Sequence, residues 1–201
     1  MNHPSANNRL KLDKLSVLVV DDNQQSLDIL GQVLSGFGVR GIHKAESGRD
    51  ALRVAGQQVF DFIVTESNMN GLDGFELVRS VRRMQGQPNA LIPILMVTSH
   101  ARISLVHRAR DSGANFLVAK PITPKVLLDR ITWVAKEDRM FVQAPNYVGP
   151  ERRFQRLGPP PGVSGRRKDD LHSELGAATS PNLSQDQINS MMKPMKVNFG
   201  P

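Results

Sequence analysis

Apolar residues gather in short runs through the first two thirds of the chain. The runs lie at 16–20, 39–44, 62–66, 91–98 and 116–119. The middle run begins Phe62-Ile63-Val64, three apolar residues in succession without alternation. Such runs are typical of strands that helices cover on both faces, whereas a strand with one solvated face alternates apolar and polar residues. We therefore predict five strands, with 62–66 at the centre of the sheet.

The segments between these runs have the apolar spacing of amphipathic helices. Leu27, Leu30 and Leu34 show this spacing, and Asp73, three positions ahead of Glu76, has the pattern of a helix start. Predicted helices cover 24–34, 47–57, 74–84, 101–112 and 123–136. Strands that alternate with helices through short connections predict an α/β fold, a doubly wound five-stranded parallel sheet with helices on both faces. This core spans residues 15–137.

The two ends of the chain differ from this core in composition. Residues 1–14 are polar and are expected to form a flexible leader. Residues 138–201 are rich in proline and glycine and hold few large apolar side chains, so we expect them to be mostly disordered and to add little stability. One exception is a short helix at 184–192, where Ser184 and Gln187 have the spacing of a capping box.

Composition excludes several classes of function. The chain has no cysteine, so disulfides, thiolate metal sites and cysteine nucleophiles are absent. The longest apolar run, 91–97, is far shorter than a membrane span, and the amino end lacks the apolar core of a secretory signal. We therefore expect a cytoplasmic protein without a membrane partner.

The net charge of +7 is spread along the chain. Residues 15–137 carry 14 Lys+Arg against 12 Asp+Glu. A protein that binds duplex DNA through its phosphates normally has a denser basic face. No helix-turn-helix pattern follows residue 137. We therefore predict that the chain has no DNA-binding domain.

Polar side chains stand where four of the predicted strands end. Asp21 and Asp22 follow the first strand, Glu66 ends the third, Thr98 ends the fourth and Lys120 follows the fifth. Singly, each has an ordinary explanation, such as a helix cap or a salt-bridged surface charge. Together they converge at one edge of a parallel sheet. Three carboxylates there could hold a divalent cation, a hydroxyl and an ammonium could bind anionic oxygens, and one carboxylate could accept a phosphoryl group.

Four stretches of sequence carry a family resemblance: VLVVDDN, DFIVTESNMNGLDGFEL, the Thr98-Ser99 pair and GANFLVAKP. They resemble the receiver (CheY-like) domain of bacterial two-component response regulators. The resemblance implies a flavodoxin-like sheet of order 2-1-3-4-5 and partners such as a histidine kinase, a phosphotransferase or a downstream effector. It further implies a phosphoacceptor at Glu66, Mg²⁺ ligands at Asp21, Asp22 and the Asn68 carbonyl, and phosphoryl-oxygen contacts from Thr98 and Lys120.

Three residues depart from the family pattern. Glu66 stands in place of the acceptor aspartate, and Asn70 stands where the family usually has proline. Leu117 stands in place of the aromatic residue that reports phosphorylation, and the neighbouring Phe116 should point to the opposite face of the sheet. We expect Glu66 to supply a built-in anion and to weaken or abolish Mg²⁺ binding. We expect the aromatic switch to be absent because Leu117 is aliphatic.

These features predict a stand-alone pseudo-receiver that acts by protein–protein contact and is not an enzyme. One alternative is a conventional phosphorylatable regulator. A second is an effector of an anionic nucleotide second messenger, because the arginine-rich extension is similar to those of receiver-like proteins that bind cyclic di-GMP. A solvated basic linker is the simpler interpretation of that extension. The candidate anion-binding residues are Arg152, Arg153, Arg156, Arg166 and Arg167.

Overall fold

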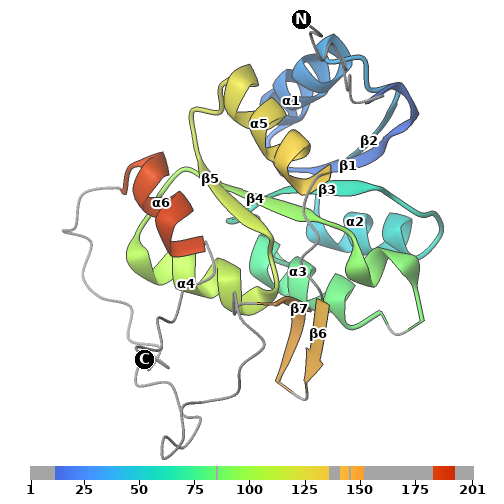
Figure 1. The fold of residues 1–201 in the computed structure, drawn as a ribbon. Helices are drawn as coiled ribbons and strands as arrows, with labels where there is room; N and C mark the ends of the chain where they lie inside the picture. The colour runs from blue at the N-terminus through green and yellow to red at the C-terminus, as the bar shows by residue number, and fades with distance from the viewer. Residues whose placement is uncertain (1–11, 85, 136–140, 145, 152–182, 193–201) are drawn as a thin grey trace, which may run out of the picture.

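Five parallel strands form one sheet in the order β2-β1-β3-β4-β5, which confirms the predicted topology (Figure 1). The computed structural model describes residues 12–84, 86–135, 141–144, 146–151 and 183–192. The strands of the sheet are β1 (Ser16–Val20), β2 (Gly41–Ala45), β3 (Phe62–Glu66), β4 (Ile94–Thr98) and β5 (Phe116–Ala119). Because all five are parallel, their carboxyl ends lie at one edge of the sheet.

Helices cover both faces of the sheet, as expected for buried strands (Figure 1). On one face lie α1 (Gln24–Gly36) and α5 (Pro124–Ala135); on the other lie α2 (Gly48–Ala55), α3 (Gly74–Arg82) and α4 (Ile103–Ser112). Two short 3₁₀ helices, η1 (Leu12–Lys14) and η2 (Pro88–Leu91), precede β1 and β4. Successive strand residues enter different layers: Val19 packs with α1, and Val20 packs on the α2–α3–α4 side.

The edges of some elements differ from the prediction. The fourth strand begins at Ile94 rather than at 91, because Pro88–Leu91 forms η2 and Pro93 has no amide hydrogen for the ladder. The second strand begins at Gly41 instead of 39, although Val39 is buried beside α1. These shifts leave the carboxyl ends of the strands where the sequence placed them.

A β-hairpin follows α5 at the start of the segment that the sequence predicts to be mostly disordered. Strands β6 (Phe141–Ala144) and β7 (Tyr147–Pro150) pair antiparallel, and β7 lies against α3 and α4. The hairpin can lie this close to the end of α4 because Gly113 and Gly149 stand at the contact. Gly113 ends α4 at φ 97°, and a Cβ on it would meet the Val148 carbonyl oxygen. Composition alone does not reveal such a meeting of two backbones.

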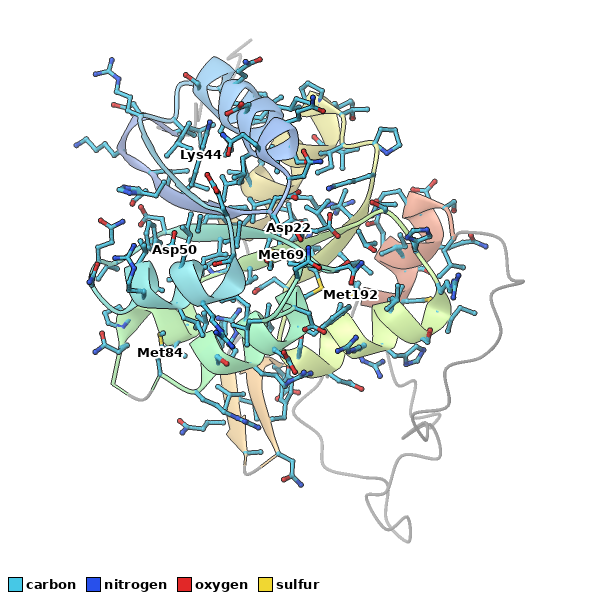
Figure 2. All side chains as sticks on the ribbon, turned by 180° about the vertical axis from the view of Figure 1, so that it is seen from behind. Asp22, Lys44, Asp50, Met69, Met84 and Met192 are labelled. Atoms are coloured by element: carbon cyan, nitrogen blue, oxygen red, sulfur yellow. The ribbon has the colours of Figure 1, made fainter. Side chains whose placement is uncertain are left out.

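Helix α6 (Gln185–Met192) lies within the short segment where the sequence predicts a helix. The capping box is formed: the Ser184 amide donates to Gln187 Oε1 (2.8 Å), and the Gln187 amide donates to Ser184 Oγ (3.3 Å). Ile188 and Met192 are buried in the core layer that α4 shares with β5, and Figure 2 labels Met192 on α6 beside that layer. The helix that the sequence predicts as the exception within the tail is therefore formed, and its apolar side is buried.

Candidate functional site

The candidate site lies where the carboxyl ends of β1, β3 and β5 meet. Asp21 follows β1, Glu66 is the last residue of β3, and Lys120 follows β5. The Lys120 ammonium lies 2.6 Å from Glu66 Oε2 and 3.0 Å from Asp21 Oδ2. The sequence prediction that strand ends bring these three residues together is thus met in the structure. One ammonium is shared between two carboxylates.

Burial makes this sharing strong. The side chains of Glu66 and Asp21 are only 6% and 2% exposed, while Lys120 is 27% exposed. A buried carboxylate without a partner would be costly, so each acid depends on the ammonium. Burial acts to lower the pKa of Lys120, but its contacts with Glu66 and Asp21 outweigh this and raise the pKa. Lys120 therefore stays charged in the folded protein.

The second oxygen of Glu66 is held by the loop that follows β3. Glu66 Oε1 accepts from the Ser67 amide (2.9 Å), the Ser67 hydroxyl (3.0 Å) and the Asn68 amide (3.2 Å). The chain turns out of the strand here, so consecutive amides face back toward the carboxylate. Amide donors stabilise an ionised carboxylate. Glu66 is thus fixed at both oxygens, by the loop on one side and by Lys120 on the other.

Asp22 faces away from this group of charges. Its Oδ2 accepts from both the amide and the side-chain nitrogen of Asn70, each at 3.0 Å. Asn70, which stands where proline is usual in the family, therefore ties the β3–α3 loop to Asp22. Figure 2 labels Asp22 near Met69 of the same loop. A proline at this position would have neither of the two donors.

The predicted Mg²⁺ ligands do not form a metal site as they are placed. Within residues 12–84, 86–135, 141–144, 146–151 and 183–192, no group of three acidic or histidine side chains could hold a metal ion. The Lys120 ammonium lies between Asp21 and Glu66, and Asp22 is bound to Asn70. The donor set therefore fits an internal ammonium better than a divalent cation. The metal roles of Asp21, Asp22 and Asn68 stay predictions.

Thr98 does not reach Glu66 in this structure. Its hydroxyl donates to the His100 carbonyl oxygen (3.0 Å) and accepts from the His100 amide (3.2 Å). The side chain is 2% exposed and serves the turn between β4 and α4. Thr98 thus lies at the expected edge, but its hydrogen bonds are local. Its role as a phosphoryl contact stays a prediction.

Leu117 and Phe116 point to opposite faces of β5, as the slipped aromatic predicts. Leu117 is buried in the layer of α3 and α4. Phe116 lies in the other layer, where its ring meets Trp133 edge-on with centroids 4.4 Å apart. At the position of the family's switch residue, the chain therefore has an aliphatic side chain packed into the core.

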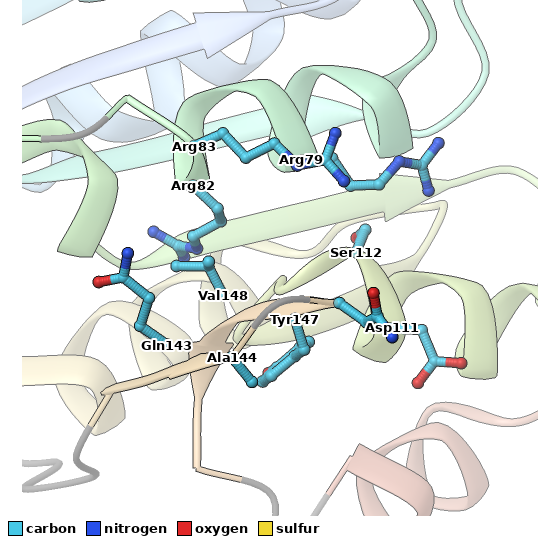
Figure 3. A pocket seen from close by; sticks show the side chains of 10 residues that line it. Arg79, Arg82, Arg83, Asp111, Ser112, Gln143, Ala144, Tyr147 and Val148 are labelled. Carbon is cyan, nitrogen blue, oxygen red and sulfur yellow. The ribbon is translucent and has the colours of Figure 1, made fainter.

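A basic cavity that the sequence did not predict lies at the other end of the molecule. It measures about 520 Å³ and is lined by α3, the end of α4 and the hairpin (Figure 3). Its lining includes Arg79, Arg82, Arg83 and Tyr147. Arginines in the last turn of a helix are ordinary partners of the helix dipole, so nothing in the sequence marks these. The tail arginines named above (152, 153, 156, 166 and 167) lie outside the described residues.

No helix in the described part of the chain has the length and apolar character needed to cross a bilayer.

Comparison with known proteins gives a consistent result. The family model for the response regulator receiver domain matches residues 17–132. The chemotaxis protein CheY of Pseudomonas aeruginosa is 34% identical over 117 residues, which cover 58% of this chain and 93% of that protein. The solved chemotaxis protein CheY4 of Vibrio cholerae is 33% identical with a TM-score of 0.56, covering 60% of this chain and 98% of CheY4.

A further solved structure is similar to this chain and contains ligands. The receiver domain of the histidine kinase CKI1 from Arabidopsis thaliana, complexed with Mg²⁺ and BeF₃⁻, is 25% identical with a TM-score of 0.55. The match covers 63% of this chain and 93% of that domain. The family match spans more than half of the 201 residues and includes every strand-end residue of the site. The chain therefore belongs to the response regulator receiver domain family.

Proposed function

We propose that this receiver is a pseudo-receiver, in which the Glu66 carboxylate takes the place of a phosphorylated aspartate. It acts in two-component signalling through protein contacts with a histidine kinase, a phosphotransferase or a downstream effector. The observation that carries the proposal is the 2.6 Å ion pair between Glu66 and Lys120. The residue at the acceptor position is already bound to the ammonium that would otherwise contact a phosphoryl oxygen.

The length of the glutamate side chain supports this assignment. Glutamate places its carboxylate roughly one C–C bond, about 1.5 Å, beyond that of aspartate. An error of about 1 Å in a reacting group can cost on the order of a hundredfold in rate. A longer acid is therefore a poor phosphoryl acceptor, but its carboxylate carries negative charge toward Lys120 without any phosphate donor.

The hydrogen bonds of Glu66 argue in the same direction. A nucleophilic carboxylate needs one oxygen free for in-line attack and a cation beside it. Here Oε1 accepts from three donors and Oε2 faces Lys120. The alternative, a conventional regulator that is phosphorylated on Glu66, requires at least one of these oxygens to be released.

Phosphoryl transfer from a small acyl-phosphate donor in the presence of Mg²⁺ tests the proposal. Intact-protein mass spectrometry should show no incorporation by the natural chain and measurable incorporation by Glu66→Asp, which shortens the acid and opens space for a cation. Glu66→Gln is the matched control, because glutamine has neither the negative charge nor a carboxylate that could accept a phosphoryl group. Incorporation at Glu66 itself would favour the conventional alternative. If Glu66→Asp neither binds Mg²⁺ nor accepts phosphate, the acceptor pocket has lost its chemistry elsewhere.

A further inference from the structure

Helix α6 covers the free edge of the sheet. β5 is the last strand in the order β2-β1-β3-β4-β5, so one side of its backbone has no strand partner. The Gln185 side chain takes that place: its Nε2 donates to the Leu117 carbonyl oxygen (3.1 Å), and its Oε1 accepts from the Ala119 amide (2.9 Å). One amide side chain thus satisfies a donor and an acceptor of the edge strand.

Apolar side chains on the same face of α6 fill the groove between β5 and α4. Ile188 is fully buried and Met192 is 7% exposed, and both belong to the core layer that contains Val106 of α4. The Leu183 amide, just before the helix, donates to the Ala101 carbonyl oxygen (2.7 Å). The groove therefore recognises a helix by a glutamine, an isoleucine three residues later and a methionine four residues after that.

We propose that the groove between α4 and β5 is a binding site for a short amphipathic helix, and that α6 occupies it as a displaceable ligand from the same chain. Isolated helices of this length are marginal in water, so α6 forms because the groove binds it. Its contacts with the domain are those of a small helix-in-groove complex, with few anchors and a polar outer face. The proposal does not depend on whether Glu66 accepts phosphate.

Helix α6 and its groove belong to the same chain, which explains why so small a helix stays bound. Binding between two parts of one chain corresponds to an effective concentration on the order of millimolar. A free peptide must compete with that concentration. A partner helix with the same pattern of glutamine, isoleucine and methionine therefore binds the receiver only when α6 leaves.

The groove is also continuous with the candidate site. Ala119 directly precedes Lys120, and Ala101 lies three residues after Thr98, so the two loops that α6 contacts begin at site residues. Occupation of the groove therefore bears on the same loops that hold the Lys120 ion pairs.

Peptide titration against the full-length chain tests this proposal. The probe is a fluorescent peptide of residues 183–192, and anisotropy measures its binding. Ile188→Asp in the protein puts a charge into the apolar groove and should expel α6, so the peptide should bind this variant at least about tenfold more tightly than the natural chain. Ser190→Asp is the matched control, because Ser190 lies on the exposed side of α6; its affinity for the peptide should equal that of the natural chain.

Further readouts keep the test decisive. Circular dichroism and urea unfolding establish that Ile188→Asp is folded. Gln185→Ala, which removes the two edge-strand hydrogen bonds and the bond to Asn189 within α6, should change peptide affinity in the same direction by a smaller factor. A peptide that itself carries Ile188→Asp should not bind. The proposal is overturned if the peptide binds the natural chain, Ile188→Asp and Gln185→Ala with equal affinity. It is also overturned if the peptide binds neither Ile188→Asp nor Gln185→Ala. A dimer of the natural chain that Ile188→Asp dissociates also overturns it, since α6 would then come from a second copy.

Discussion

Two cations lie at opposite edges of the sheet and are stabilised in different ways. At the carboxyl edge, the Lys120 ammonium is shared by two buried carboxylates. At the amino edge, the Arg82 guanidinium is 3% exposed, and its hydrogen bonds within the described residues all end on neutral oxygens. These acceptors are the carbonyl oxygens of Gly113, Ala90 and Ile92 and the side-chain oxygen of Asn115.

The two cations therefore differ in what they do. The charge balance around Lys120 can change, whereas Arg82 stabilises the fold. Charge balance at Lys120 changes whenever one acid is replaced, shortened or neutralised. Burial lowers the pKa of Arg82 to about 9, but carbonyl oxygens accept from the guanidinium in fixed directions and do not titrate. Arg82 thus joins α3, η2 and the start of β5, and its guanidinium lies 4.8 Å from the centre of the Phe141 ring.

The largest effect is expected from Arg82→Leu. Four acceptors would each lose a hydrogen bond, with only Asn115 Oδ1 keeping a second donor, and the contact with Phe141 would be lost, so the free energy of unfolding should fall by about 4 kcal/mol. Urea unfolding at neutral pH measures this. The control is Arg83→Leu, since Arg83 is the exposed neighbour on the same helix; it should change stability by no more than about 0.5 kcal/mol. Equal losses for the two variants would contradict the structural role of Arg82.

Lys120→Met should have the next largest effect. It leaves two buried carboxylates without a cation, and the expected loss is about 3 kcal/mol, the usual cost of breaking a buried pair. Lys125→Met is the control, because Lys125 is 85% exposed in its pair with Asp129; it should lose about 0.5 kcal/mol or less.

A second substitution sharpens this comparison. Adding Glu66→Gln to Lys120→Met removes one of the two uncompensated charges and should restore part of the lost stability. A double variant that is no more stable than Lys120→Met alone would show that Glu66 and Lys120 are not energetically coupled.

The carboxyl edge was predictable because topology carries most of the information. Continuous apolar runs predict β1, β3 and β5 as strands of one parallel sheet, and parallel strands bring the residues at their carboxyl ends to one edge. Glu66 and Lys120 meet for that reason. The hydrogen-bond partners of Asp22 and Thr98 were not predictable. Asn70 and His100 bind them because of the conformation of two loops, and apolar periodicity carries no information about loop conformation.

At the amino edge, nothing in the sequence predicted that Arg82 is buried. An arginine in the last turn of α3 is expected to be solvated, but the hairpin, the segment before β4 and the turn between α4 and β5 surround Arg82. The hairpin in turn requires the close approach at Gly113. Likewise, the capping box predicted α6, but its amphipathic pattern does not say which groove it fills.

Gly113→Ala tests the hairpin with a smaller expected effect. Alanine at φ 97° is strained by roughly 1–2 kcal/mol, and its Cβ would also meet the Val148 carbonyl oxygen. Gly38→Ala is a matched control, because Gly38 has φ 93° and open space around its Cβ position. The loss for Gly113→Ala should exceed that for Gly38→Ala, and hydrogen exchange across 141–150 should accelerate only in the former. Equal losses and unchanged exchange would mean that the hairpin adds nothing to the amino edge.

The smallest effect is expected from alkaline pH and concerns Lys120 alone. Burial opposes its charge, but Glu66 and Asp21 raise its pKa above the ordinary value of 10.5, which the unfolded chain retains. Between these two pKa values the folded state binds more protons than the unfolded state, so stability falls as pH rises. The contribution is therefore complete below pH 10.5 and is lost as pH passes the raised pKa of the folded protein.

Comparison with Lys120→Met isolates this contribution from other groups that titrate in the same range. The difference in unfolding free energy between the natural chain and Lys120→Met should be constant from about pH 8 to about pH 10 and should shrink above that range. A difference that stays constant to about pH 12 would show that the ammonium of Lys120 is not what stabilises the two buried acids.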